Sequence, residues 1–291
     1  MLSAAHRDIV KATVPLLEVG GEALTTHFYQ LLFRDHPEVR PFFNQTHQAS
    51  GTQPRALANS VLQYAKHIDN LAGLGALPAQ IVNKHVSLQV APAHYPVVGK
   101  CLLQAIREVL GAEVATDAVL EAWGAAYQQL AEILIGAEEA VYAQNEAASG
   151  GWRGVRAFRL ARRERESEEI ASFHLEPVDG QPVVRHLPGQ YLGLRLEIHG
   201  REVRRNYSIS ATANGASYRI SVKREPGGLV SGFLHEQARV GQVIEVFPPA
   251  GEFVLGAGNG PVALIGGGVG VTPLMAMLQA AAPSGREVVF I

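Results

Sequence analysis

The periodicity of apolar side chains changes near residue 150, and this change constrains the fold more than any other feature. Before that point apolar residues recur at helical spacing, as in Leu57, Val61, Leu62, Ala65 and Ile68. After it, apolar and polar residues alternate in short segments such as 171–175, 191–198, 218–222 and 243–246. Because a helix and a strand need different periods, the 291 residues are expected to form more than one domain.

The first part of the chain is predicted to be entirely helical. No proline occurs between Pro96 and Pro177, so residues 97–110 and 117–146 can form long helices. Clusters of Gly, Pro and Asp interrupt the sequence elsewhere and favour about six to eight helices in this part. We therefore expect an all-α domain over residues 1–147.

The second part is predicted to form a small antiparallel β-barrel over residues 148–260. Its short strands, including an expected one at 203–210, are separated by turn residues, and one short helix is expected at 229–236. Residues 262–265, 266–270 and 273–282 then read as a buried strand, a glycine turn and a helix, with a second strand at 287–291. This pattern predicts the start of an α/β nucleotide-binding domain over residues 261–291. Since such a domain needs on the order of 100 residues, we expect the natural protein to continue beyond Ile291.

Composition excludes several classes of protein. The single cysteine, Cys101, excludes a disulfide framework, a Cys-rich zinc site and a thiolate-held iron–sulfur cluster. A net charge of −2 gives no reason to expect nucleic acid or an anionic membrane as a partner. The N-terminus has no apolar targeting segment, and no long uncharged apolar run follows. We expect a cytoplasmic monomer with no stable membrane association.

Histidines are concentrated in the helical part, where seven of the eleven precede residue 100. An all-α domain of this size with one metal-ligating histidine would suit haem. Both His67 and His85 lie among apolar residues at helical spacing, so periodicity alone does not choose between them. Either one alone could equally be an ordinary core or surface histidine.

An ordered set of residues in the helical part adds to this pattern. The set consists of Phe28-Tyr29, Pro41-Phe42-Phe43, Gln53 with Leu57, Lys84-His85, Tyr95 and Glu138. In this order and spacing it resembles the globin domain of bacterial flavohaemoglobins. The resemblance continues through Gly151-Trp152 and covers essentially the whole chain. It implies that the first domain is a globin that binds one haem b.

The resemblance also assigns roles within that domain. The residues implied in haem contacts are Phe43, Leu57, Lys84 and His85, with His85 as the iron ligand. Tyr29 and Gln53 would form the distal polar pair, because a phenol or amide N–H in a dry pocket stabilises negative charge on bound oxygen. Taken alone, Tyr29 would read as a core tyrosine.

Two further residues are implied behind the iron ligand. Glu138 would accept a hydrogen bond from Nδ1–H of His85, with Tyr95 beside it. A carboxylate in that place fixes the tautomer of the imidazole and makes it a stronger electron donor. Without the resemblance, Glu138 next to Glu139 would read as solvated helix surface.

The expected strand at 203–210 carries a short motif, Arg205-Asn206-Tyr207-Ser208, which resembles the R-x-Y-S signature of ferredoxin-reductase-like flavin domains. Arg205 can pair bidentately with the pyrophosphate of FAD, in a geometry that lysine does not supply. Tyr207 would pack on the isoalloxazine ring, and Ser208 would hydrogen-bond near its reactive nitrogen. The neighbouring Arg204 adds charge, and we expect it to point to solvent.

Other segments resemble further parts of the same reductase family. Additional FAD contacts are implied for Tyr191, Gly227, Gly228, Val230 and Ser231. The run at 266–273 resembles the G-x-G-x-T-P nucleotide motif, in which glycines and a helix N-terminus hold a pyrophosphate. The implied NAD(P)H contacts are Gly268, Val269, Gly270, Val271, Thr272 and Pro273. The choice between NADH and NADPH stays open.

Together these resemblances imply a nitric oxide dioxygenase. Such an enzyme uses electrons from NAD(P)H, through FAD and haem b, to convert NO and O₂ to nitrate and so detoxify NO. The alternative is an oxygen-binding or redox-sensing globin whose reductase part keeps the haem ferrous. A lipid in the distal haem pocket is a further partner that no residue pattern tests.

Replacing Tyr29 by phenylalanine tests the distal assignment. We expect Tyr29→Phe to speed the dissociation of O₂, because the phenolic donor is lost. Stopped-flow measurement of the oxygen off-rate checks this, and an unchanged off-rate would remove Tyr29 from the distal site.

Overall fold

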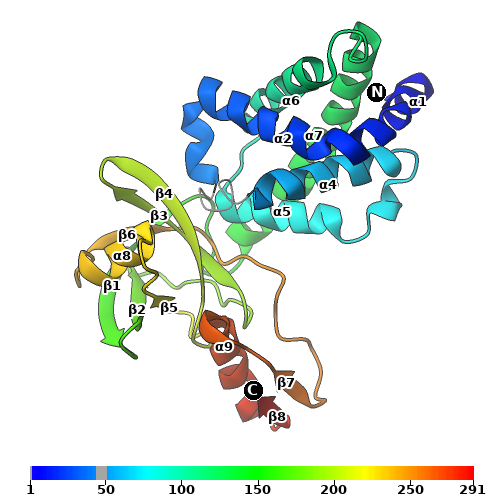
Figure 1. Ribbon diagram of the computed structural model, residues 1–291. Coiled ribbons are helices and arrows are strands. Elements are labelled where there is room, and N and C mark those ends of the chain that lie inside the picture. The colour runs from blue at the N-terminus through cyan, green and yellow to red at the C-terminus, as the bar shows by residue number, and fades with distance from the viewer. Residues whose placement is uncertain (1, 44–50) are drawn as a thin grey trace. The chain divides into compact units, whose positions relative to one another are not determined.

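The computed structural model describes residues 2–43 and 51–291 (Figure 1). The chain divides into two compact units. The first comprises the residues up to Val82 together with Val90–Glu139, and the second comprises Asn83–Gln89 together with Ala140–Ile291. Two helices, α5 (Leu77–Leu88) and α7 (Asp117–Ala147), contribute residues to both units.

The first unit is helical in its described residues, as the sequence predicts. Its elements are α1 (Ala4–Ala12), α2 (Val14–Asp35), η1 (Pro37–Phe42), α4 (Thr52–Lys66), η2 (Leu71–Leu74), α5 (Leu77–Leu88), α6 (His94–Leu110) and α7 (Asp117–Ala147). Local signals set the ends: the Ser3 hydroxyl accepts a hydrogen bond from the His6 N–H at 3.1 Å, and Gly111 ends α6 with φ +76°. The long helices expected at 97–110 and 117–146 are confirmed.

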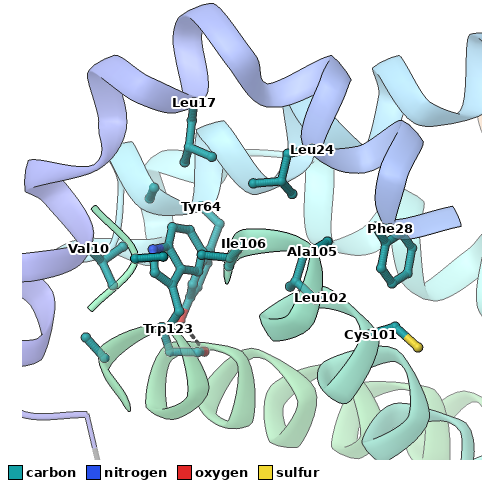
Figure 2. Close-up of a cluster of buried hydrophobic side chains, with 14 of the residues drawn as sticks. Val10, Leu17, Leu24, Phe28, Tyr64, Cys101, Leu102, Ala105, Ile106 and Trp123 are labelled. Carbon is teal, nitrogen blue, oxygen red and sulfur yellow. Dashed lines mark hydrogen bonds between the residues drawn. The ribbon is translucent and has the colours of Figure 1, made fainter. Parts of the chain in front are cut away.

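The core of this unit is apolar, with its few polar atoms paired (Figure 2). Val10, Ala105 and Ile106 are buried at its centre. The indole N–H of Trp123 donates to the Thr13 hydroxyl at 3.3 Å, which satisfies a donor that would otherwise cost free energy in the interior. The phenol of Tyr64 likewise donates to the carbonyl of Ala126, at 2.8 Å.

The second unit contains the predicted antiparallel barrel. Its elements are β1 (Arg156–Arg165), β2 (Ile170–Pro177), β3 (Tyr191–Ile198), β4 (Arg201–Ser208), β5 (Tyr218–Lys223), α8 (Leu229–Glu236) and β6 (Val243–Val246). The strand order is β4-β3-β6-β1-β2-β5, and every neighbouring pair is antiparallel. A bridge between Ile209 and Ile220 joins the end of β4 to β5 and closes the sheet into a barrel.

Strand β1 is the element that the sequence patterns above do not identify. The strand is rich in arginine, and only a short part of it alternates, with Phe158 and Leu160 fully buried. Both side chains belong to the barrel core, while Arg159 between them is exposed. A register shift between Leu160 and Arg162 further breaks the two-residue period that sequence analysis relies on.

The last segment is the predicted start of an α/β unit. It consists of β7 (Val262–Leu264), η3 (Gly268–Gly270), α9 (Val271–Ala281), η4 (Ala282–Ser284) and β8 (Val288–Phe290). Strands β7 and β8 are parallel, and α9 connects them. The helix begins two residues earlier than predicted because Pro273 is tolerated within a first turn, where its missing N–H is not needed. No helix among the described residues is long and apolar enough to cross a membrane.

Because Leu160 of β1 is buried in the barrel core, its truncation should destabilise the barrel. We expect Leu160→Ala to lower the free energy of unfolding by about 2–5 kcal/mol, because Leu160 is fully buried. A urea titration with hydrogen exchange read separately for barrel and helical peptides measures this. Leu187→Ala is the matched control, because Leu187 is 56% exposed; its effect should stay within about 0.5 kcal/mol. Equal effects of the two variants would contradict the assigned core.

Candidate functional site

Tyr29 lies within an aromatic cluster of the first unit. Its side chain is 7% exposed on α2, and its ring centroid lies 5.7 Å from that of Phe33 and 5.6 Å from that of Phe43. Phe33 and Phe43 contact each other edge to face, at 5.2 Å. The structure therefore brings Tyr29 and Phe43 together, as the family resemblance implies for one side of a haem site.

The start of α4 is fixed against α2 near this cluster. The hydroxyl of Thr25 donates to the carbonyl of Pro54 at 2.9 Å, and Thr25 is 1% exposed. This bond places Gln53, in the first turn of α4, beside the helix that carries Tyr29. Gln53 is half-buried, and its amide makes no hydrogen bond with a described residue. Leu57, one turn later, packs against the same core as the aromatic rings.

Glu138 is buried, whereas its neighbour Glu139 is exposed. Glu138 is 2% exposed on α7 and accepts a hydrogen bond from the phenol of Tyr95, 2.5 Å away. Burying a carboxylate costs free energy unless it is hydrogen-bonded, so the pair with Tyr95 is a built arrangement rather than a solvated helix surface. Glu139 does follow the solvated pattern.

The two candidate histidines have different surroundings. His67 caps α4: its Nδ1 lies 3.0 Å from the carbonyl of Gln63, and its ring packs so closely on Gly73 that a Cβ there would approach Cδ2 to 2.3 Å. His85 and Lys84 lie in the last turn of α5, within Asn83–Gln89, and belong to the second unit. Tyr29, Phe43, Gln53, Leu57, Tyr95 and Glu138 belong to the first unit. His67 therefore has local structural contacts at the end of α4.

Arg205 on β4 is a half-buried cation without a counter-ion. Its Nη1 donates to the carbonyl of Arg204 at 2.7 Å, and no carboxylate of the described residues pairs with it. Burial lowers the pKa of the guanidinium, because removal from water disfavours the charged form. Such a cation suits an anionic ligand, and the planar fork suits a pyrophosphate in particular.

Two tyrosines and a serine surround the same hairpin. In the β3–β4 register Ser208 lies opposite Tyr191, and Tyr207 lies opposite Leu192. Burial raises the pKa of Tyr207 to about 12, so its phenol stays neutral at physiological pH. Gly251, at φ +111°, lies under the ring of Tyr191, where a Cβ would approach Cε1 to 2.7 Å. Tyr207 shares the face of the hairpin that carries Arg205, and Tyr191 and Ser208 share the other face.

The glycine turn before α8 is stabilised by hydrogen bonds among its own residues and by packing on the barrel core. Gly227 has φ +70°, and Gly228 is the N-cap of the helix. The Ser231 hydroxyl accepts from the Glu225 N–H at 3.2 Å, and Val230 is buried in the barrel core. The Val230 side chain therefore stabilises the barrel, and the backbone N–H groups of this turn are what could bind a ligand.

The residues predicted to hold NAD(P)H lie at the start of α9. Gly268 has φ +55°, which favours glycine, and the run through Gly270 forms η3. The hydroxyl of Thr272 donates to the carbonyl of Val269 at 2.8 Å and closes the first turn, which also contains Val271 and Pro273. The predicted order of strand, glycine turn and helix N-terminus is confirmed.

The expectation that Arg204 points to solvent is wrong. Its side chain is only 10% exposed, because successive residues of β4 point to opposite faces and Arg204 lies on the face opposite Arg205. Its partners are Glu202, Phe247 and the carbonyl of Leu88. Sequence analysis missed this role. The alternation of side chains along the strand could have placed Arg204 on the face opposite Arg205, but nothing in the sequence indicates its contact with Leu88, 116 residues away.

Comparisons with known proteins agree with this architecture. The Globin family matches residues 26–134, and the family described as Oxidoreductase FAD-binding domain matches residues 157–255. Flavohemoproteins of Pseudomonas aeruginosa and Pseudomonas putida are 66% and 64% identical over all of this chain, which covers 74% of each protein. The structure of a flavohemoglobin from Malassezia yamatoensis, with bound FAD and heme, has a TM-score of 0.84 and 28% identity, covering 99% of this chain and 76% of that one.

The helical unit, the antiparallel barrel and the α/β start occur in one chain, in the order that the sequence predicts. The relatives that are 66% and 64% identical align over the whole length of this chain. The chain belongs to the flavohemoprotein family.

Proposed function

We propose that this chain binds haem b and FAD and acts as an NAD(P)H-dependent nitric oxide dioxygenase that detoxifies NO. The overall reaction converts two NO and two O₂ to two nitrates for each NAD(P)H oxidised to NAD(P)⁺. The observation that carries the proposal is the buried Glu138 carboxylate with its Tyr95 partner. An oxygen-storage globin does not need a carboxylate that enriches the proximal ligand in electrons.

The residues of the helical part would supply binding and orientation at the haem. His85 would be the iron ligand, with Phe43, Leu57 and Lys84 as further haem contacts. Glu138 and Tyr95 would increase the electron density of the proximal imidazole. Tyr29 and Gln53 would donate hydrogen bonds to the bound oxygen, and the apolar rings around Tyr29 would keep water out.

The residues of the barrel fit FAD, because Arg205 is a half-buried cation with no carboxylate partner among the described residues. Arg205 would hold the pyrophosphate, Tyr191 and Tyr207 would pack on the rings, and Ser208 would donate a hydrogen bond to the flavin. Bound FAD accepts a hydride as an electron pair and releases single electrons, which a haem requires. The turn at 268–273 would position NAD(P)H.

The remaining partners follow from the same proposal. O₂ and NO are the small-molecule substrates, and the protein would work as a monomer in the cytoplasm. The competing function is an oxygen-binding or redox-sensing globin with its own reductase. Occupation of the distal pocket by a lipid would be an additional property of either.

Sustained consumption of NO distinguishes these functions. The chain, loaded with haem and FAD, is given O₂ and small additions of NO. Electrons are supplied either by NADH or by a sacrificial tertiary-amine donor that reduces the bound flavin under illumination. We expect many nitrates per haem, and one nitrate for each NO, in the illuminated reaction of this chain. The light reaction does not depend on nucleotide binding.

The control for this experiment is the dark reaction without NADH. There, NO loss should stop after about one equivalent per haem, since no electrons restore the ferrous state. If the illuminated chain also stops after one equivalent and keeps a stable oxygen complex, the binding or sensing function replaces the dioxygenase.

If Arg205 binds the pyrophosphate of FAD, its replacement should lower the affinity of the chain for FAD. Loss of a charge-assisted bidentate contact should weaken binding about tenfold to a hundredfold in Arg205→Lys, measured by titrating the apoprotein with FAD. Arg201→Gln is the matched control, because Arg201 is an exposed arginine of the same strand. Equal FAD affinity in all three proteins would exclude Arg205 from the pyrophosphate site.

A further inference from the structure

The C-terminal end of α5, which carries His85, is held by strand β4. Both segments belong to the second unit. Nη1 of Arg204 donates to the carbonyl of Leu88, the last residue of α5, at 2.5 Å. The same guanidinium pairs with Glu202 at 2.7 Å and lies over the ring of Phe247, 5.2 Å from its centroid. Arg204 is therefore fixed on three sides and is not a mobile surface charge.

Two other carbonyls at this helix end also have partners, those of His85 and Val86. The last turn of a helix leaves carbonyls without intrahelical donors. The His85 carbonyl accepts from the phenol of Tyr142 at 3.5 Å. The Val86 carbonyl accepts from the backbone N–H and the side-chain amide of Gln89, at 3.0 and 2.8 Å. Gln89 has φ +59°, a left-handed conformation that closes the helix without a glycine.

A second contact joins β4 to the same helical turn. The amide of Asn206 donates to the Ser87 hydroxyl at 3.5 Å, and that hydroxyl donates to the carbonyl of Lys84 at 2.8 Å. Gly193, the register partner of Asn206, lets the barrel backbone come close: a Cβ there would lie 3.0 Å from the Ser87 carbonyl oxygen. Ser87 is 2% exposed, so this contact is dry.

Side chains alternate between the two faces of β4, and this alternation relates the contacts with α5 to the residues expected to bind FAD. Arg204 and Asn206 lie on one face of the strand and hold the turn of α5 that contains His85. Arg205 and Tyr207 lie on the other face, whereas Ser208 and its register partner Tyr191 lie on the face of Arg204 and Asn206. Residues expected to contact FAD therefore occur on both faces of β4. A shift of β4 therefore moves the flavin residues and the turn that carries His85 together.

We propose that Arg204 and Asn206 are positioning residues that fix His85 relative to the flavin-binding residues of β4, and thereby set the rate of electron transfer from flavin to haem. The inference rests on the proposed function in so far as electrons must pass between the two groups. The guanidinium also places a positive charge at the C-terminal end of the α5 dipole, which stabilises that end. Lysine cannot reproduce the planar fork that Glu202 and the Leu88 carbonyl share.

The test compares Arg204→Gln, Arg204→Lys and Asn206→Ser with the unchanged chain, each loaded with haem and FAD. Three quantities are measured: the rate of haem reduction under CO after a light flash that reduces the flavin in the presence of a sacrificial tertiary-amine donor, the iron–histidine stretching band of the ferrous haem, and the FAD dissociation constant. The matched control is Arg195→Gln. Arg195 is the register partner of Arg204, but it pairs with Glu245 at 2.6 and 2.7 Å and has no contact with α5 among its described partners.

We expect Arg204→Gln to slow electron transfer by about tenfold or more, since misplacement of reacting groups is costly. The iron–histidine band should broaden or shift, with FAD affinity within about twofold of the unchanged chain. Arg204→Lys should recover part of the rate, and Asn206→Ser should show a smaller slowing of the same kind. Arg195→Gln should behave as the unchanged chain does.

Two results would overturn the inference. One is an unchanged rate and band in both Arg204→Gln and Asn206→Ser. The other is a slowing that follows only from loss of FAD, because that would place these residues in the flavin site alone. If Arg204→Gln does not fold, Asn206→Ser decides. A chain that transfers electrons but does not consume NO repeatedly would refute the proposed function and leave this inference standing.

Discussion

Successive side chains of a strand point to opposite faces, and in β4 this alternation separates two adjacent arginines. Arg205 faces a place where it has no carboxylate partner among the described residues, so its charge is available to an anion. Arg204 is enclosed by Glu202, Phe247 and the end of α5, so its charge is used within the protein. Residues of one type therefore have different roles because of the pleat alone. A bulge or register slip in β4 would exchange these roles, since it would turn each side chain to the other face.

Burial of polar groups is the second physical constraint on the site. The Glu138 carboxylate and the Tyr95 phenol share a short hydrogen bond in the interior of the helical unit. An isolated carboxylate there would cost several kcal/mol, so the phenol is part of what makes the burial possible. In the barrel, burial raises the pKa of Tyr207 to about 12, so that ionisation of its phenol is disfavoured further.

Periodicity predicts the architecture well because helices and strands of this chain bury one face each. The long helices α6 and α7, the helix α8 and strands β3, β5 and β6 all lie where the patterns place them. Strand β1 escapes prediction because arginines surround its two buried residues and a register shift interrupts its period. Its central place in the barrel order shows that a strand can be buried on one face and strongly basic on the other.

The candidate site was predictable only where a local motif carries it. The R-x-Y-S run identifies Arg205, Tyr207 and Ser208, and the ordered set in the globin part identifies His85. The contacts at the end of α5 were not predictable, because Leu88 and Arg204 lie far apart in the sequence and meet only in the fold. His67 shows the converse: its spacing matches that of His85, but its ring caps a helix and packs on Gly73.

If the chain acts as proposed, its barrel supplies electrons to the haem of the same chain. The most direct measurement is anaerobic: a sacrificial tertiary-amine donor reduces the bound FAD of the unchanged chain under light and CO, and the haem spectrum is followed at several protein concentrations. The account predicts that the ferrous CO complex forms at a rate independent of protein concentration, as an intramolecular transfer must. A flavin that becomes reduced while the haem stays ferric, or a rate proportional to protein concentration, would contradict it.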